Sequence, residues 1–163
     1  MSAANRTTSS TLSNLTTVTT KTVYRMTPAC AITWSNNTVI TLSADLAIVT
    51  DGSLTSVNQV NLKTADSTVR NLFLIMPTGT PCPGGNLTLS NNTTLDNIRF
   101  LLNTPCTATI NNNNNGVGGQ IYAGTVSTTN LYTMNFDPLI IPGAGVITGF
   151  KVDIAFIREI VNP

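Results

Sequence analysis

Apolar and polar residues alternate between Thr38 and Thr50, and this pattern restricts the fold more than any other feature of the sequence. Every second position is apolar, at Ile40, Leu42, Ala44, Leu46 and Ile48. Successive side chains of a β-strand point to opposite faces, so a period of two predicts a strand with one buried face. Asp51-Gly52 follows this segment and is a frequent turn dipeptide, so we expect a hairpin turn there.

The same alternation returns near the end of the chain, over residues 146–156. Lys151 and Asp153 share one face of this segment. The opposite face carries the apolar residues Val146, Phe150, Val152, Ile154 and Phe156. A helical period would not separate the two sets in this way, so we expect a strand whose apolar face lies in the core.

Further segments of strand-forming residues are separated by clusters of Asn, Gly and Pro. They are 20–26, 57–63, 68–76, 86–90, 97–103, 107–110, 120–127 and 130–136. No segment predicts an amphipathic helix. About eight to ten short strands in one chain are typical of an all-β sandwich or barrel. We therefore expect one all-β domain over residues 23–163, an antiparallel β-sandwich of the jelly-roll type. The Asn-rich run 111–119 is expected to be a hairpin tip or an exposed loop.

Residues 1–22 differ from the rest of the chain, because 12 of them are Ser or Thr. One interpretation is a disordered tail. The other is an extended arm that pairs with a sheet of a neighbouring subunit, since Thr and Val favour the strand conformation. The near absence of charge in this segment favours the arm. Its expected anchors are Leu12, Leu15, Val18 and Val23.

The chain has three cysteines, so at least one of them is free or bonded to another chain. Cys82 and Cys106 both follow a Thr-Pro pair, and we expect any disulfide to join these two. Cys30 is the remaining thiol. The spacing of the cysteines and the absence of His disfavour both a metal site and a catalytic thiol.

The chain is nearly neutral, with 8 Lys and Arg residues against 7 Asp and Glu, and only 9% of its residues are charged. Eight scattered cations do not form the basic surface that nucleic acids need, so we expect no nucleic-acid partner. The longest apolar run, residues 72–76, is too short for membrane insertion. The carboxylates are dispersed and His is absent, so we expect neither an enzyme nor a cofactor.

A sheet protein normally protects its edges with charges, above all Lys. This chain has only three Lys residues, which indicates edges occupied by copies of itself. The composition is similar to that of bacterial extracellular fibre, spore-surface and appendage subunits. We therefore expect a self-assembling structural subunit, located outside the cell or on the surface of a cell, spore or virion.

Two other functions remain open at this point. One is a structural component of a virion, such as a tail-fibre, decoration or capsid protein. The other is a carbohydrate-binding adhesin module, in which Trp34 would be the aromatic platform for a glycan. A single Trp in an all-β protein is more often a core residue, so the structural subunit is the main prediction.

Overall fold

The computed structural model describes residues 5–6, 12–26, 30–111, 118–129 and 134–139, and most of these residues lie in strands. The strands are β1 (Asn5–Arg6), β2 (Thr17–Val18), β3 (Thr22–Met26), β4 (Ile32–Trp34), β5 (Val39–Leu42), β6 (Leu46–Thr50), β7 (Leu54–Ser56), β8 (Asn61–Thr64), β9 (Arg70–Ile75), β10 (Leu87–Leu89), β11 (Thr94–Asp96), β12 (Ile98–Asn111), β13 (Gly118–Thr129) and β14 (Asn135–Phe136). Within the described ranges, helical backbone is confined to Leu12 and Ser13.

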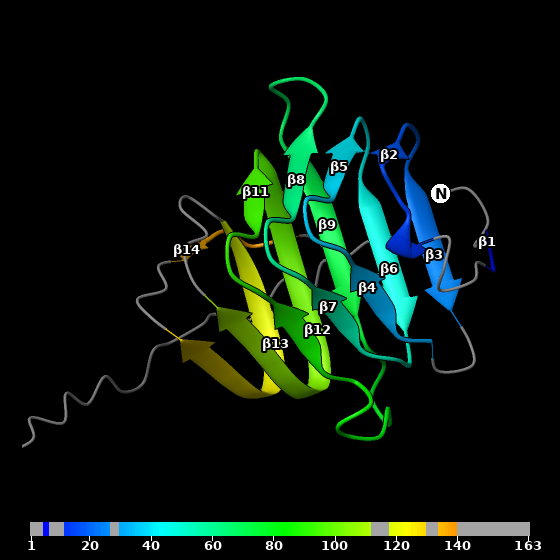
Figure 1. The fold of residues 1–163 in the computed structure, drawn as a ribbon, viewed down its shortest axis with the longest axis vertical. Helices are drawn as coiled ribbons and strands as arrows, with labels where there is room; N and C mark the ends of the chain where they lie inside the picture. The colour runs from blue at the N-terminus through cyan, green and yellow to red at the C-terminus, as the bar shows by residue number, and fades with distance from the viewer. Residues whose placement is uncertain (1–4, 7–11, 27–29, 112–117, 130–133, 140–163) are drawn as a thin grey trace, which may run out of the picture.

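Every strand pair in the described residues is parallel, and most strands pair with the strand three places further along the chain. One sheet has the order β11-β8-β5-β2. The other has the order β1-β3-β6-β9-β12-β10-β7-β4, with β13 and β14 added beside β12. The chain thus winds as a solenoid, in which β2–β4, β5–β7 and β8–β10 form three successive coils (Figure 1).

The expected antiparallel sandwich of the jelly-roll type is wrong, although the chain is all-β as expected. Among the described residues, the turn signal at Asp51-Gly52 is a corner of a coil and does not form a hairpin. Asp51 and Gly52 join β6 to β7, but these two strands do not pair with each other. Instead, β6 pairs with β3 and β9, and β7 pairs with β4 and β10. A parallel pair needs a long connection, and the rest of a coil supplies it.

Strand β12 occupies two sides of the solenoid without a break. Its first half, from Ile98 to Asn103, pairs with β9, and its second half, from Ala108 to Ile110, pairs with β10. Strand β13 then pairs in parallel with β12 from Arg99 to Asn111, with a shift of register between Thr104 and Thr107. The two segments expected at 97–103 and 107–110 are therefore one strand.

The predicted alternation is confirmed from Ile40 to Thr50, because the even-numbered positions there are buried and the odd-numbered ones are more exposed. The segment is nevertheless two strands, β5 and β6, which meet at a corner over residues 43–45. Inward side chains of successive coils lie in register. One such ladder runs from Ile48 through Leu74 to Leu102, all at most 1% exposed. Contacts of this kind between the coils form one main core.

The corner that precedes β5, β8 and β11 repeats from coil to coil. Asn37, Gln59 and Asn92 occupy equivalent positions and have positive φ angles of 62, 61 and 58°. Asn tolerates this left-handed conformation better than most residues, which explains the recurrence of Asn here. The tetrapeptide Ser-Asn-Asn-Thr stands at residues 35–38 and again at 90–93. Asn92 also donates a side-chain hydrogen bond to Asn58 Oδ1 at 3.1 Å, which links two coils.

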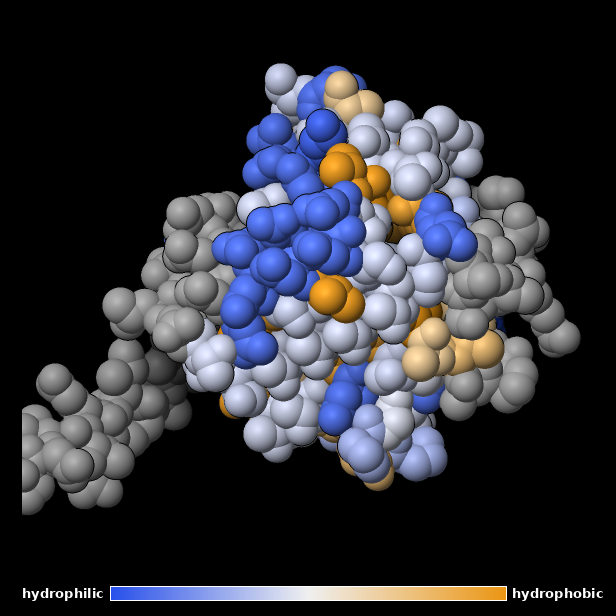
Figure 2. Space-filling view, in the orientation of Figure 1, coloured by the Kyte–Doolittle hydropathy of each residue, from blue (hydrophilic) through white to orange (hydrophobic). Residues whose placement is uncertain are grey.

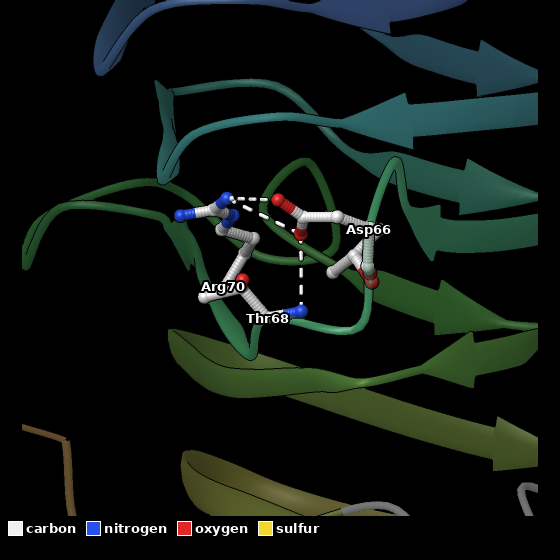
Figure 3. A network of polar contacts seen from close by, with 4 residues as sticks. Asp66, Thr68 and Arg70 are labelled. Carbon is white, nitrogen blue, oxygen red and sulfur yellow. Dashed lines mark hydrogen bonds and ion pairs between the residues drawn. The ribbon is translucent and has the colours of Figure 1, made fainter.

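The third coil carries two insertions. The first, between β8 and β9, is closed by Asp66, whose Oδ1 accepts the Thr68 backbone N–H at 3.0 Å (Figure 3). Arg70 Nη2 also pairs with Asp66 Oδ2 at 3.0 Å. The second insertion lies between β9 and β10 and contains Cys82. The alternating segment 146–156 lies outside the described residues, as do residues 112–117 of the Asn-rich run. Because β12 and β13 pair in parallel, they are not the two strands of a tight hairpin.

Candidate assembly surface

The N-terminal end of the solenoid is covered by the chain's own residues. Leu12, Leu15 and Val18 are 0%, 7% and 3% exposed and belong to the main core. Trp34 Nε1 donates to the backbone oxygen of Leu12 at 3.0 Å. Ser13 Oγ accepts the backbone N–H of Thr33, on edge strand β4, at 3.2 Å. Residues 12–15 therefore act as a cap on the first coil.

Three of the four expected arm anchors, Leu12, Leu15 and Val18, thus come together in the core of the same chain. The fourth, Val23, is half-buried on β3, at a position that alternates with the core-packed Tyr24. Docking of the arm on a neighbouring subunit stays a prediction. The assignment of residues 1–22 as a separate unit also stays a prediction, although β2 pairs with β5 of the body.

Among the described residues, the opposite end of the solenoid is formed by β13, at the left of the sheet in Figure 1. Strand β14 pairs with β13 only at Gly118 and Gly119. From Gln120 to Thr129, no described strand pairs with β13 on the side away from β12. This stretch contains no charged residue. It therefore lacks the charges with which edge strands normally resist association.

Two inward positions of β13 extend core ladders yet are open to solvent. Ile32, Leu54, Leu87 and Ala108 are in register and fully buried, and Val126 is the next member of this ladder. Val126 is 52% exposed. Thr128 extends the neighbouring ladder, which contains Ile110, and is also exposed. The core side of β13 is therefore a place where a further coil could stack.

The wider surface is polar without being strongly charged. On the face shown in Figure 2, side chains of neutral to hydrophilic character predominate, and apolar residues are visible only in scattered areas. The three ion pairs among the described residues are Lys21–Asp45, Arg70–Asp66 and Arg99–Asp137. None of these ion pairs includes a residue of β13 beyond Gly119.

Cys82 and Cys106, the pair chosen from the sequence, form a disulfide with a Cα–Cα distance of 5.5 Å. The bond ties the second insertion of the third coil to the middle of β12. Gly85 is required beside it, because a Cβ there would lie 2.8 Å from Thr80 Cγ2 and 3.1 Å from Cys106 Sγ. Cys30 is a half-buried free thiol.

Trp34 is fully buried, so it is not the glycan platform that the carbohydrate-binding alternative required. Within the described ranges, no three His, Cys, Asp or Glu side chains gather as they would around a metal ion. In the same part of the chain, no helix has the length and apolar character needed to cross a membrane.

Val126 and Thr128 were not predicted from the sequence as residues of an assembly surface. The available signal was the repeat of Ser-Asn-Asn-Thr at 35–38 and 90–93, which marks equivalent corners of different coils. A repeat of this kind indicates a stacked architecture, whose last unit exposes core positions unless it is capped.

Comparison of the chain with models of protein families, with curated proteins and with solved structures found no match.

Proposed function

We propose that this protein is a self-assembling structural subunit that associates with copies of itself through β13. The observation that carries the proposal is the exposure of Val126 at an inward position of a ladder that is otherwise buried. Burial of its side chain by a second subunit would extend the core by the same contacts that join successive coils.

The backbone of β13 supports the same proposal. A strand edge presents N–H and C=O groups that another strand can bind, and the stretch from Gln120 to Thr129 has no charge to oppose this pairing. The N-terminal end is different, because residues 12–15 cover it. The two ends of the solenoid are thus unequal, and we place the self-association at the β13 end.

The disulfide supports a location outside the cell or on the surface of a cell, spore or virion. Disulfides between ordinary structural cysteines persist in oxidising surroundings and are rare in the cytosol. The virion component named as an alternative would use the same self-association and differ only in the particle to which the subunit belongs.

The test substitutes a charge into the exposed ladder position. Val126→Lys should keep the protein folded and reduce its self-association, because a Lys at this position opposes both burial and strand pairing. The matched control is Val39→Lys. Val39 is 43% exposed, and its strand β5 already has partners on both edges.

Sedimentation velocity over a range of concentrations, with electron microscopy of the same samples, gives the measurement. We expect oligomers or polymers for the unmodified protein and for Val39→Lys, and mainly monomers for Val126→Lys. The proposal is rejected if the unmodified protein stays monomeric at all concentrations, or if Val126→Lys assembles as well as Val39→Lys.

A further inference from the structure

An open groove lies at the start of β13, away from the edge proposed for self-association. Its volume is about 370 Å³, near the lower end of the range typical of small-molecule sites. The residues around it come from the residue before β9, the β11–β12 corner, the start of β12, the start of β13, and β14 with the residue after it. Its polar and aromatic lining includes Asn97, Arg99, Gly118, Asn135, Phe136 and Asp137.

The groove contains one cation and one anion, held together. Arg99 Nε pairs with Asp137 Oδ2 at 2.5 Å, and the two side chains are 47% and 36% exposed. Gly118 leaves room for this pair, because a Cβ there would lie 3.2 Å from Asp137 Cβ. The paired charges cancel, yet both side chains remain partly exposed to solvent. The groove therefore suits a neutral ligand rich in hydrogen-bonding groups.

Phe136 gives the groove an aromatic surface. Its side chain is 67% exposed, the largest exposure among the exposed large hydrophobic residues of the described chain. The amides of Asn97 and Asn135 line the same groove and supply both donors and acceptors. Asn97 holds a left-handed backbone conformation, with φ of 57°, directly before β12. An exposed aromatic ring among planar polar groups matches a ligand with one apolar face and hydroxyl groups around its rim.

We propose that this groove binds a neutral saccharide, with a sugar ring stacked on Phe136. The C–H face of a pyranose would contact the aromatic ring, and its hydroxyl groups would reach Asn97, Asn135 and the Arg99–Asp137 pair. The volume fits about one or two sugar rings. This site differs from the Trp34 platform considered from the sequence, and it does not depend on self-association.

The test measures binding of three neutral probes, cellotetraose, maltotetraose and the tetramer of N-acetylglucosamine, by isothermal titration calorimetry. We expect at least one of them to bind the unmodified protein. Phe136→Ala should weaken that binding about tenfold or more. Tyr122→Ala is the matched control, because Tyr122 is an aromatic residue of β13 that is 53% exposed and lies outside the groove.

The proposal is overturned if none of the three probes binds, if Phe136→Ala binds as well as the unmodified protein, or if Tyr122→Ala loses as much affinity as Phe136→Ala. A second measurement needs no variant. Titration of the bound probe into ¹⁵N-labelled protein should shift the side-chain amide signals of Asn97 and Asn135. If these signals stay fixed while others move, the saccharide binds elsewhere and the assignment of the groove fails.

Discussion

The indole N–H of Trp34 donates a hydrogen bond to the carbonyl oxygen of Leu12 over 3.0 Å. Both residues are fully buried, so neither group has water as an alternative partner. The bond fastens the N-terminal cap to β4 of the first coil. The single Trp of the chain is therefore both a core side chain and the donor that holds the cap in place.

Trp34→Phe should lower the free energy of unfolding by about 1–3 kcal/mol, because it removes a buried hydrogen bond and leaves the Leu12 oxygen with only the Leu15 backbone N–H at 3.3 Å as donor. The smaller ring also leaves unfilled space, which acts in the same direction. Urea denaturation followed by circular dichroism measures the change. Val39→Ala, at an exposed position on β5, should stay within about 0.5 kcal/mol of the unmodified protein. Equal stability of Trp34→Phe and the unmodified protein would contradict the role of the bond.

The double variant Cys82→Ala/Cys106→Ala should be less stable by about 3 kcal/mol. The two cysteines are 24 residues apart, and closing a loop of that length restricts the unfolded chain by roughly this amount. The variant should also show faster proteolysis of the second insertion in the third coil. Cys30→Ala serves as the control, because Cys30 is a free thiol. A peptide map under non-reducing conditions that joins Cys30 to either of the other cysteines would refute the pairing.

Asp66 should make stability depend on pH in the acidic range. The hydrogen bond from the Thr68 backbone N–H, with the nearby Arg70 guanidinium, lowers the pKa of the Asp66 carboxyl group below its usual 3.8, and desolvation opposes this only in part. Since the pKa is lowered in the folded state, the stabilisation is present above the usual pKa. The stabilisation is lost as the pH falls through the lower pKa that Asp66 has in the folded protein.

The variant Asp66→Asn should therefore lose stability near neutral pH and show a flatter stability curve below about pH 5. Thermal unfolding at several pH values provides the measurement. Ser67→Ala lies in the same loop and does not change the charge, so its stability should depend on pH as that of the unmodified protein does. If the stability of Asp66→Asn and that of Ser67→Ala depend on pH in the same way, a carboxylate other than Asp66 causes the pH dependence.

Side-chain alternation predicted from the sequence which residues are buried in β5 and β6. It could not predict the direction of pairing, because the period of two is the same in parallel and antiparallel sheets. The residue types at the corners do not indicate the direction of pairing either. Asn and Gly permit positive φ angles in a hairpin and in a corner such as that at Asn37 alike.

The solenoid repeat was obscured by the two insertions. Val39 pairs with Asn61, and Asn61 pairs with Thr94, so the spacing of equivalent residues changes between coils. The candidate assembly surface depends on which strand is last in the stack, and that order follows only from the pairing. The groove at Phe136 likewise forms because β14 lies beside β13, a contact that no local pattern in the sequence indicates.

The parallel pairing also determines how this chain must reach its native state. Because Val39 finds its partner Asn61 only after the chain has passed through β6 and β7, β5 cannot nucleate on its immediate successor, and the same holds for every described strand before β12. Most native contacts are consequently non-local, and a high relative contact order slows folding. During that interval the apolar faces of unfinished coils remain accessible to other chains. Refolding at high concentration should therefore compete with aggregation, and slow production of the chain should favour the soluble product.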